Sequence, residues 1–470
     1  MRLKQITKLL FIVLLVSGSS SCNDNSSEYS TSELSGDAQI YSFKIAAKPY
    51  TAIDTVNYPA LLTTGFAINQ FSKLIYNPDS LPYRTTLKKC AVTLGYASSG
   101  IGKVELIYPK DSIVDWNTSD SIDFSTYLYP KFRITPLNGK DPKEYTVKIL
   151  VHQEDPDTLI WKEKTVTNYP ASFNKQKTIL VGDSIFYTFT TGADNKVYLS
   201  KAKKPERTET PLVYETKQAV SKLNASTLIL ESVTFFNGKF YAVDDSKQGY
   251  AADSDGIAWS DDGISGNLTN IAGALPTTDV TTDSLLVITE KEGKYYFAKT
   301  SDLKKLVFRT EEQYEVSMDF PLSEYSSATN FDRNNLNNCI LAITGGKNTS
   351  GFYNNLTWSI KTTSDNVLQI ARNQANNVFA AKSGISTFLY DKYLYALTGN
   401  KLYKTASYGY KWGAAPNKEI LDAGIPEASG QSVITDSKNH IWIFGGIPDA
   451  GTAPIQKVWT GRINRLRPKL

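Results

Sequence analysis

The stretch that decides the fold lies near the C-terminus, where residues 441–463 read IWIFGGIPDAGTAPIQKVWTGRI. An apolar strand runs into a pair of glycines, a loop follows, and a second strand opens on Trp459. Residues 340–360 repeat this layout, with a second glycine pair and with Trp358 at the position of Trp459. The stretch is therefore not a lone hairpin but one copy of a repeat.

Four further copies complete the repeat. Residues 239–261 carry Asp244-Asp245 at the position of the glycines and Trp259 at that of the tryptophan, and shorter strand–turn–strand copies occupy residues 184–200, 284–299 and 392–406. The six copies begin at intervals of about 50 residues, a period that is typical of a four-stranded propeller blade. A single blade leaves apolar faces uncovered, so the sequence predicts an all-β domain of six blades stacked in a closed ring.

The sixth copy is one strand short, because the chain ends at Leu470. Residues 158–166, TLIWKEKTV, form a strand that precedes the first copy and has no partner of its own. We predict that this strand completes the last blade and closes the ring. The propeller domain would then span residues 158–470.

The loops between the second and third strands suggest a binding face. They are long in the copies at residues 244–256, 345–355 and 445–456, and short in the other three. Such loops emerge on one face of a propeller, so we expect these three to surround the central channel; the alternative is three unrelated insertions. Aromatic platforms with amide and carboxylate partners suit sugars or peptides. The candidate ligand-binding residues are Tyr250, Asp253, Asp255, Asn348, Phe352, Tyr353, Asn354 and Asp449.

The N-terminus has the features of an export signal. Residues 1–22 read MRLKQITKLLFIVLLVSGSSSC, in which a basic start is followed by an apolar stretch too short to span a bilayer, and then by small residues before Cys22. The small residues before Cys22 resemble a bacterial lipobox, whose cysteine becomes the acylated first residue. The resemblance implies a lipoprotein signal peptide at 1–21 and a membrane anchor at Cys22. The alternative is an ordinary signal peptide with a chance cysteine.

Removal of residues 1–21 takes away three of the 51 basic residues and none of the 47 acidic ones, which leaves a net charge of +1. This balance gives no indication of nucleic-acid binding. Residues 22–36 are polar and low in complexity, and we expect them to act as a flexible tether.

Residues 37–153 alternate apolar and polar positions with a period of two and show no convincing helix, which predicts a small antiparallel β-sandwich. Its last strands, within DFSTYLYPKFRITPLNGKDPKEYTVKILV (123–151), resemble the Ig-like modules of Bacteroidota surface lipoproteins. The Gly-Gly and later Trp of the repeats resemble the kelch motif. The whole arrangement is similar to an uncharacterised Bacteroidota lipoprotein family with an Ig-like module and a six-bladed, kelch-like propeller. That resemblance implies a fold and a cell-envelope location at the outer membrane, but no activity.

Several chemistries are disfavoured by composition. His152 and His440 are the only histidines, too few for a His-rich zinc or copper site, and neither lies near a nucleophile motif. The turn DSDG at 253–256 is too short for an EF-hand loop, so Ca²⁺ binding remains only an alternative there. We expect no cofactor and no metal.

The cysteines and tryptophans favour packing roles. Cys90 and Cys339 fall in different predicted domains, so we expect no disulfide between them. Trp259, Trp358 and Trp459 recur at the repeat period, which indicates packing between blades rather than ligand stacking.

Two functional hypotheses follow. The first is a lipid-anchored cell-envelope protein whose propeller is non-catalytic and binds a glycan or another surface protein, or acts as a scaffold. The second is a glycoside hydrolase or lyase that uses paired carboxylates on the loop face. The sequence names neither the ligand nor a catalytic residue.

Overall fold

The computed structural model describes residues 33–47, 60–97, 100–110, 112–308, 314–373, 378–448 and 453–465. The chain divides between Glu154 and Asp155 into two compact units. Nearly all the regular structure is strand. The described helical segments are a single turn at residues 60–63 and two short 3₁₀ turns, η1 (Val280–Thr282) and η3 (Leu336–Asn338). Within these ranges, no helix has both the length and the apolar character needed to cross a membrane.

The first unit packs two sheets around one core. The smaller sheet pairs β1 (Ser42–Ala47) antiparallel with β4 (Cys90–Gly95). The larger has the order β2-β3-β8-β7-β5-β6 and contains β2 (Ala67–Asn69), β3 (Leu74–Tyr76), β5 (Lys103–Tyr108), β6 (Ser112–Asp115), β7 (Lys131–Thr135) and β8 (Lys143–Lys148). Alternation along the strands buries Phe43 and Ile45 of the smaller sheet in one core with Phe132 and Tyr145 of the larger.

The sequence predicted a wholly antiparallel sandwich, but this unit contains a parallel pair of strands. β3 runs parallel to β8, with Leu74 opposite Thr146. The expectation of an antiparallel sandwich is wrong at this pair because it rested on hairpin turns, and no hairpin joins two strands so far apart in the chain.

Six sheets make up most of the second unit. In the first five, the order of the strands across the sheet follows their order in the chain. The last sheet follows the same rule except that its final strand is β9, from the start of the unit. The first is β11 (Lys175–Val181), β12 (Ile185–Thr191), β13 (Lys196–Lys203) and β15 (Gln218–Asn224); the second is β16 (Leu228–Phe236), β17 (Lys239–Asp244), β18 (Gly249–Ala252) and β19 (Trp259–Ser260). The third is β20 (Leu268–Leu275), β21 (Ser284–Lys291) and β22 (Lys294–Thr300); the fourth is β23 (Ser326–Phe331), β24 (Cys339–Thr344), β25 (Thr357–Thr362) and β26 (Leu368–Arg372).

The remaining two sheets lie nearest the C-terminus. The fifth is β27 (Ser386–Tyr390), β28 (Tyr393–Thr398), β29 (Lys401–Thr405) and β30 (Gly413–Ala414); the sixth is β32 (Ser432–Thr435), β33 (Ile441–Phe444), β35 (Val458–Ile463) and β9 (Leu159–Lys164). Two short pairs accompany them, β10 (Val166–Thr167) with β14 (Leu212–Val213), and β31 (Ala428–Ser429) with β34 (Ile447–Pro448).

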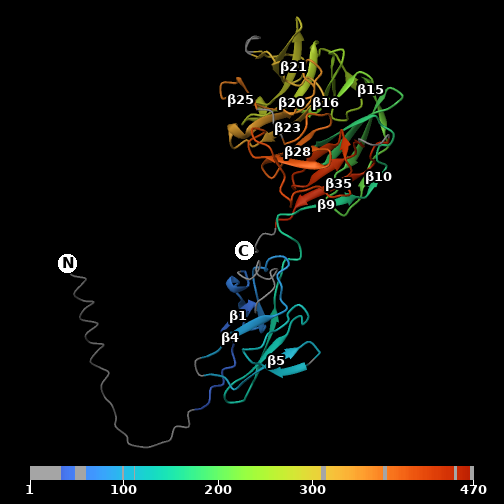
Figure 1. Ribbon diagram of the computed structural model, residues 1–470. Helices are drawn as coiled ribbons and strands as arrows, with labels where there is room; N and C mark the ends of the chain where they lie inside the picture. The colour runs from blue at the N-terminus through green and yellow to red at the C-terminus, as the bar shows by residue number, and fades with distance from the viewer. Residues whose placement is uncertain are drawn as a thin grey trace, which may run out of the picture. The chain divides into compact units, whose positions relative to one another are not determined.

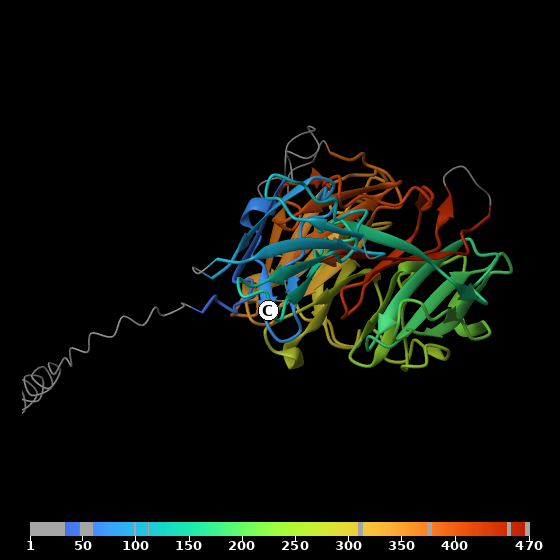
Figure 2. The ribbon, with the colours of Figure 1, turned by 90° about the horizontal axis from the view of Figure 1, so that it is seen from below.

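The six sheets form a closed ring. The first strands contact one another in the cyclic order β11, β16, β20, β23, β27, β32 and back to β11. Figure 2 shows the colours of this unit passing from green through yellow and orange to red, so that the last sheet meets the first. This arrangement, in which each sheet buries a face against its neighbour, is that of a β-propeller.

The last sheet takes its outer strand from the start of the unit. β9 pairs antiparallel with β35 along six register pairs, from Val458 opposite Lys164 to Ile463 opposite Leu159. Figure 1 shows green β9 beside red β35. The Trp161 ring lies over Gly461, where an added Cβ would be 2.5 Å from the ring. The strand that the sequence placed at 158–166 is therefore present in the predicted position.

The glycine pairs let two loops fold back on their own sheets. Gly346 and Gly446 have φ angles of 91° and 101°, which favour glycine. An added Cβ would lie 2.7 Å from the Ser323 carbonyl oxygen at Gly346 and 3.0 Å from that of Ser429 at Gly446. The next residue in each loop then bridges to the segment before the first strand of its sheet.

The copy at residues 239–261 differs from this pattern, which corrects a prediction. Residues 249–252 are the third strand, β18, and Trp259 lies on the fourth strand, β19. The turn between the second and third strands is therefore short, and only residues 345–356 and 445–457 form long loops there. Trp259, Trp358 and Trp459 are all buried, as predicted, but they reach the layer between sheets from different strands.

Candidate functional site

The predicted ligand-binding residues do not share one face of the ring. Asp253 follows β18 and pairs with Lys239, the first residue of β17, at 3.0 Å. The long loop at 345–356 follows the last residue of a second strand, β24. Because second strands run in the same direction around a propeller, Asp253 and Asp255 lie at the end of the ring opposite this loop.

The side chains of the predicted residues near β18 form hydrogen bonds with residues close to them in the chain. The Tyr250 hydroxyl donates to Asp244 Oδ2 at 2.9 Å, and burial together with this hydrogen bond raises the pKa of Tyr250 to about 12. Asp255 Oδ1 accepts a hydrogen bond from the Ile257 amide at 3.0 Å. These contacts are ordinary turn chemistry.

The loop at 345–356 is well organised. Asn348 Oδ1 accepts hydrogen bonds from the amides of Ser350 and Phe352, both at 3.0 Å, and Asn354 Nδ2 donates to the Asp319 carbonyl oxygen at 3.0 Å. Phe352 is left 71% exposed. Asp449, the predicted residue of the other long loop, lies outside the described residues, as does Cys22.

Tyr353 points to a charged group that the sequence did not single out. Its hydroxyl donates to Glu324 Oε2 at 2.5 Å, and Lys347 Nζ lies 2.6 Å from Glu324 Oε1 and 5.0 Å from the Tyr353 ring centroid. Burial alone would raise the pKa of Glu324, but the hydrogen bonds from Lys347 and Tyr353 outweigh it and the pKa is lowered. Glu324 is therefore a carboxylate at neutral pH.

Glu324 lies close to groups from sheets that are not its neighbours. Its backbone amide donates to Glu231 Oε1 at 2.8 Å, although Glu231 belongs to the second sheet and Glu324 precedes the fourth. Lys177 of the first sheet donates to the Glu231 carbonyl oxygen. Contacts that skip a sheet are possible only near the axis of the ring. We call Lys177, Glu231, Glu324, Lys347 and Tyr353 the axial cluster.

A bulge places Glu231 in this cluster. The register of β16 against β17 shifts between Ile229 and Thr234. Ser232 holds the bulge, because its hydroxyl accepts from the Val243 amide at 2.8 Å and donates to the Ile229 carbonyl oxygen at 2.6 Å. Bulges re-aim side chains and are frequent beside functional sites.

The burial of the Lys177 ammonium is poorly compensated by polar partners. It keeps some solvent-accessible surface but is surrounded by protein, and this desolvation lowers its pKa to about 8 despite the opposing effect of Glu231. Among the described residues it forms no ion pair, and its only hydrogen bond is to the Glu231 carbonyl oxygen. The second carboxylate oxygen of Glu231 accepts no hydrogen bond in the same part of the chain.

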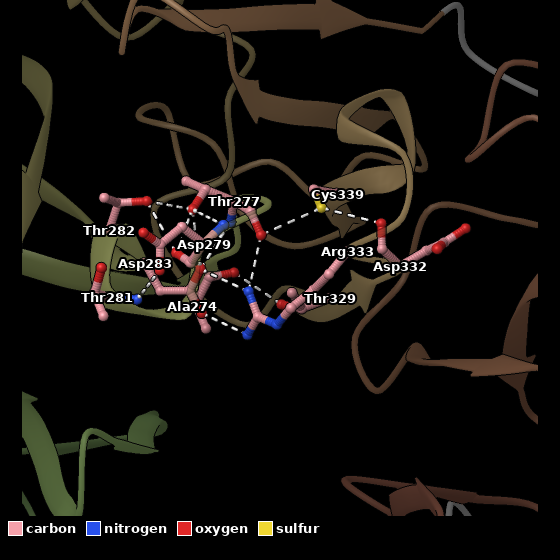
Figure 3. Close-up of polar contacts among 10 residues, drawn as sticks. All are labelled: Ala274, Thr277, Asp279, Thr281, Thr282, Asp283, Thr329, Asp332, Arg333 and Cys339. Carbon is pink, nitrogen blue, oxygen red and sulfur yellow. Dashed lines mark hydrogen bonds and ion pairs between the residues drawn. The ribbon is translucent and has the colours of Figure 1, made fainter.

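A second charged cluster lies between the third and fourth sheets (Figure 3). Arg333 donates to both carboxylate oxygens of Asp283, at 3.0 and 2.7 Å, and to the Thr277 carbonyl oxygen at 2.8 Å. Asp283 also accepts from the Thr277 amide at 2.7 Å, and the buried Cys339 thiol donates to the carbonyl oxygens of Thr277 and Asp332. These groups satisfy one another, so we interpret the cluster as a clamp between sheets.

The cysteines and the possible metal ligands were the remaining candidates for chemistry. Cys90 and Cys339 are free and buried in different units, as predicted. No group of three or more His, Cys, Asp or Glu side chains placed to hold a metal ion occurs in the described ranges.

Sequence reasoning missed Lys177, Glu231, Glu324 and Lys347. One signal was present for Glu231, which is the charged residue of the otherwise largely apolar strand LILESVTFF, whereas Lys177 lies in the mixed strand KQKTILV. A charge in such a strand marks a position that faces away from the core, and in a propeller the first strand faces the axis.

Comparison with known proteins gives a fold without an activity. Residues 155–469 match the DUF6242 beta propeller domain, and residues 42–149 match the DUF6242 N-terminal domain, a domain of unknown function. A search of curated proteins finds no match.

Three solved structures match the chain at low identity. The first, titled "Structure of YjhT", is 9% identical, with 70% of this chain and 87% of that chain covered and a TM-score of 0.32. A protein of unknown function from Bacteroides thetaiotaomicron VPI-5482 is 10% identical, with coverages of 80% and 95% and a TM-score of 0.37. The BP39L lectin from Burkholderia pseudomallei is 11% identical, with coverages of 62% and 99% and a TM-score of 0.31. Values this low carry no argument about function.

Proposed function

The chain belongs to the DUF6242 family, and on that premise we propose that it is a non-catalytic binding protein of the cell envelope whose ligand meets the propeller at the axial cluster. The observation that supports this most is the convergence of partly exposed charged groups from three sheets on the ring axis. The exposed Phe352 in the loop that carries Tyr353 adds an aromatic surface beside them. Charged groups with an aromatic neighbour suit a glycan or a surface protein.

The proposal includes the finer architecture. The six sheets are the six blades of a kelch-like propeller, and the first unit is an Ig-like spacer. Residues 1–21 are a lipoprotein signal peptide, and acylation of Cys22 holds the protein on the outer membrane of a Bacteroidota cell. Labelling of cells with an alkyne fatty acid tests the anchor: the wild-type protein should be labelled and a Cys22→Ser variant should not.

Arrays of glycans and peptides probed with the mature chain test the binding function. We expect a saturable ligand whose binding is weakened by Glu324→Gln, which removes the charge that pairs with Lys347. Asp253→Asn is the matched control, because Asp253 lies at the opposite end of the ring, and it should leave binding unchanged. Saturable binding that responds to Asp253→Asn instead would overturn the assignment of the site.

One observation keeps the second hypothesis open. The Glu231 carboxylate accepts a hydrogen bond from the Glu324 backbone amide, so two residues with carboxylates meet near the axis, and a hydrolase or lyase of this kind uses a pair of carboxylates. The lowered pKa of Glu324 suits a base or a nucleophile but not a general acid. Turnover of aryl glycosides by the mature chain, abolished by Glu324→Gln, would favour catalysis over simple binding.

A further inference from the structure

The charges of the axial cluster and of Lys175 beside it do not balance. Lys347 is paired with Glu324 at 2.6 Å, and Lys175, at the start of β11, also acts on Glu324 through its charge. With Lys177, three ammonium groups face the two carboxylates of Glu231 and Glu324. The cluster together with the neighbouring Lys175 therefore carries a net charge of about +1, which is complementary to a ligand with a single negative charge.

The hydrogen-bonding capacity of the cluster is also incomplete. An ammonium group has three donors, and Lys177 uses one of them within the described residues. The carboxylate of Glu231 uses one oxygen for the Glu324 amide and has acceptor capacity left on the other. A ligand that completes both groups must present an anionic oxygen to Lys177 and a hydroxyl or amide N–H to Glu231.

We propose that the axial cluster recognises the carboxylate of a small monoanionic ligand, with Lys177 as the donor and Glu231 as the acceptor for a neighbouring hydroxyl or amide. The inference rests on the binding function proposed above and names the chemistry of its ligand. A charge-assisted hydrogen bond from a partly desolvated ammonium is stronger than one in bulk water. A dianion such as phosphate fits less well, because Glu231 and Glu324 would repel the second charge.

The ionisation of Lys177 makes this interaction sensitive to pH. Its pKa of about 8 means that the ammonium form falls from roughly nine-tenths of the molecules at pH 7 to roughly one-tenth at pH 9. A ligand that binds only this form should bind about tenfold more weakly at pH 9 than at pH 7. The other titratable groups of the cluster and its surroundings are Glu231, Glu324, Lys347, Tyr353 and Lys175.

Calorimetric titration of the mature chain with two matched pairs tests the proposal. Glucuronate and glucose differ in the carboxylate of a sugar, and N-acetylalanine and its amide differ in the carboxylate of a peptide end. We expect saturable binding of the acid and not of the neutral partner in at least one pair, and the pair that responds tells whether the carboxylate belongs to a sugar or to a peptide end. Lys177→Met should abolish this binding, and it should weaken about tenfold between pH 7 and pH 9.

Lys222→Met is the control, because Lys222 is an exposed residue of the same sheet, paired with Asp261 at 2.6 Å. It should leave binding unchanged. Equal binding of acids and neutral partners, no binding of either acid, or acid binding that survives Lys177→Met, would overturn the inference. A neutral ligand found on the arrays, with binding that depends on Glu324, would leave the proposed function standing; no saturable ligand in either experiment would remove both.

Discussion

Two of the charged groups that join sheets in this propeller, the seam between the first and last sheets and the axial cluster, differ in their hydrogen bonding. At the seam between the first and last sheets, Lys204 is 7% exposed and lies 2.7 Å from Asp183 and 3.3 Å from Asp436. Asp436 also accepts from the Trp442 indole at 3.1 Å and from the His440 amide at 2.8 Å. In the axial cluster, by contrast, Lys177 and Glu231 keep unused capacity.

This difference in hydrogen bonding distinguishes a group of charges that stabilises the fold from one that can bind a ligand. Burial alone would raise the pKa of Asp436, but hydrogen bonds from His440 and Trp442 lower it, so the seam carboxylate is held ionised among saturated partners. Such a network stabilises the fold and offers nothing to a ligand. A partly exposed cluster with unused donors and acceptors gains most from a ligand that completes it.

Removal of the closing strand should have the largest effect on the stability of the ring. Deletion of residues 158–166 removes all six register pairs with β35 and uncovers the core beside Trp459. We expect the second unit to lose cooperative thermal unfolding by calorimetry, because β35 is then left with an open edge and the start of the unit no longer pairs with its last sheet. A synthetic peptide of residues 155–168 should restore the transition in a concentration-dependent way. A deletion variant that unfolds like the wild type would show that the ring does not depend on β9.

Loss of the seam carboxylate should come next. Asp436→Ala leaves Lys204 with Asp183 alone and leaves the Trp442 indole without its acceptor. We expect the free energy of unfolding to fall by about 3–5 kcal/mol, as for other broken buried ion pairs. Urea denaturation measures it.

The sign of the pH dependence provides a second check on this residue. Because the pKa of Asp436 is lowered in the fold, its stabilisation is present above the unfolded value, near 4, and is lost as the pH falls below it. The difference in stability between the wild type and Asp436→Ala should therefore shrink in acid. A difference that grows below pH 4 would contradict the assignment.

The clamp in Figure 3 should give a smaller effect. Arg333→Ala leaves Asp283, which is 5% exposed, with the Thr277 amide but without its bidentate partner. Because the Arg333 side chain is 34% exposed, we expect a loss of about 2 kcal/mol rather than the seam value. Arg372→Ala is the matched control, since its pair with Asp319 is 51% exposed on both sides, and it should cost at most about 1 kcal/mol. Equal losses would mean that burial does not set the contribution of these pairs.

Much of the ring could be predicted from the sequence, because strand alternation, turn residues and the repeat period are local signals. The closing strand followed from counting, since one strand was missing at the end of the ring and one was spare at its start. The copy at 239–261 was misaligned because Trp259 was matched to Trp358 by spacing. Spacing along the chain does not report which strand of a sheet carries a residue, and Trp259 reaches the core from the fourth strand.

The axial cluster could not be predicted from the sequence, for a different reason. Lys177 and Glu231 are 54 residues apart, and Glu231 and Glu324 are 93 apart, so only closure of the ring brings them together. The bulge around Ser232 has no turn signal of its own, because it depends on a side-chain hydrogen bond to the neighbouring strand. Of the predicted binding residues that the structure describes, Tyr353 alone belongs to this cluster.

The free energy of unfolding of Lys177→Met, measured by urea denaturation beside that of Asp436→Ala, tests most directly whether the axial cluster is a binding site rather than a structural one. Methionine keeps the length of the side chain and removes an ammonium that makes one described hydrogen bond in a desolvated place. If the cluster is kept for binding, the variant should be as stable as the wild type within about 1 kcal/mol, or more stable. A loss of about 3 kcal/mol or more, comparable to that of Asp436→Ala, would show that Lys177 supports the fold and would contradict the account.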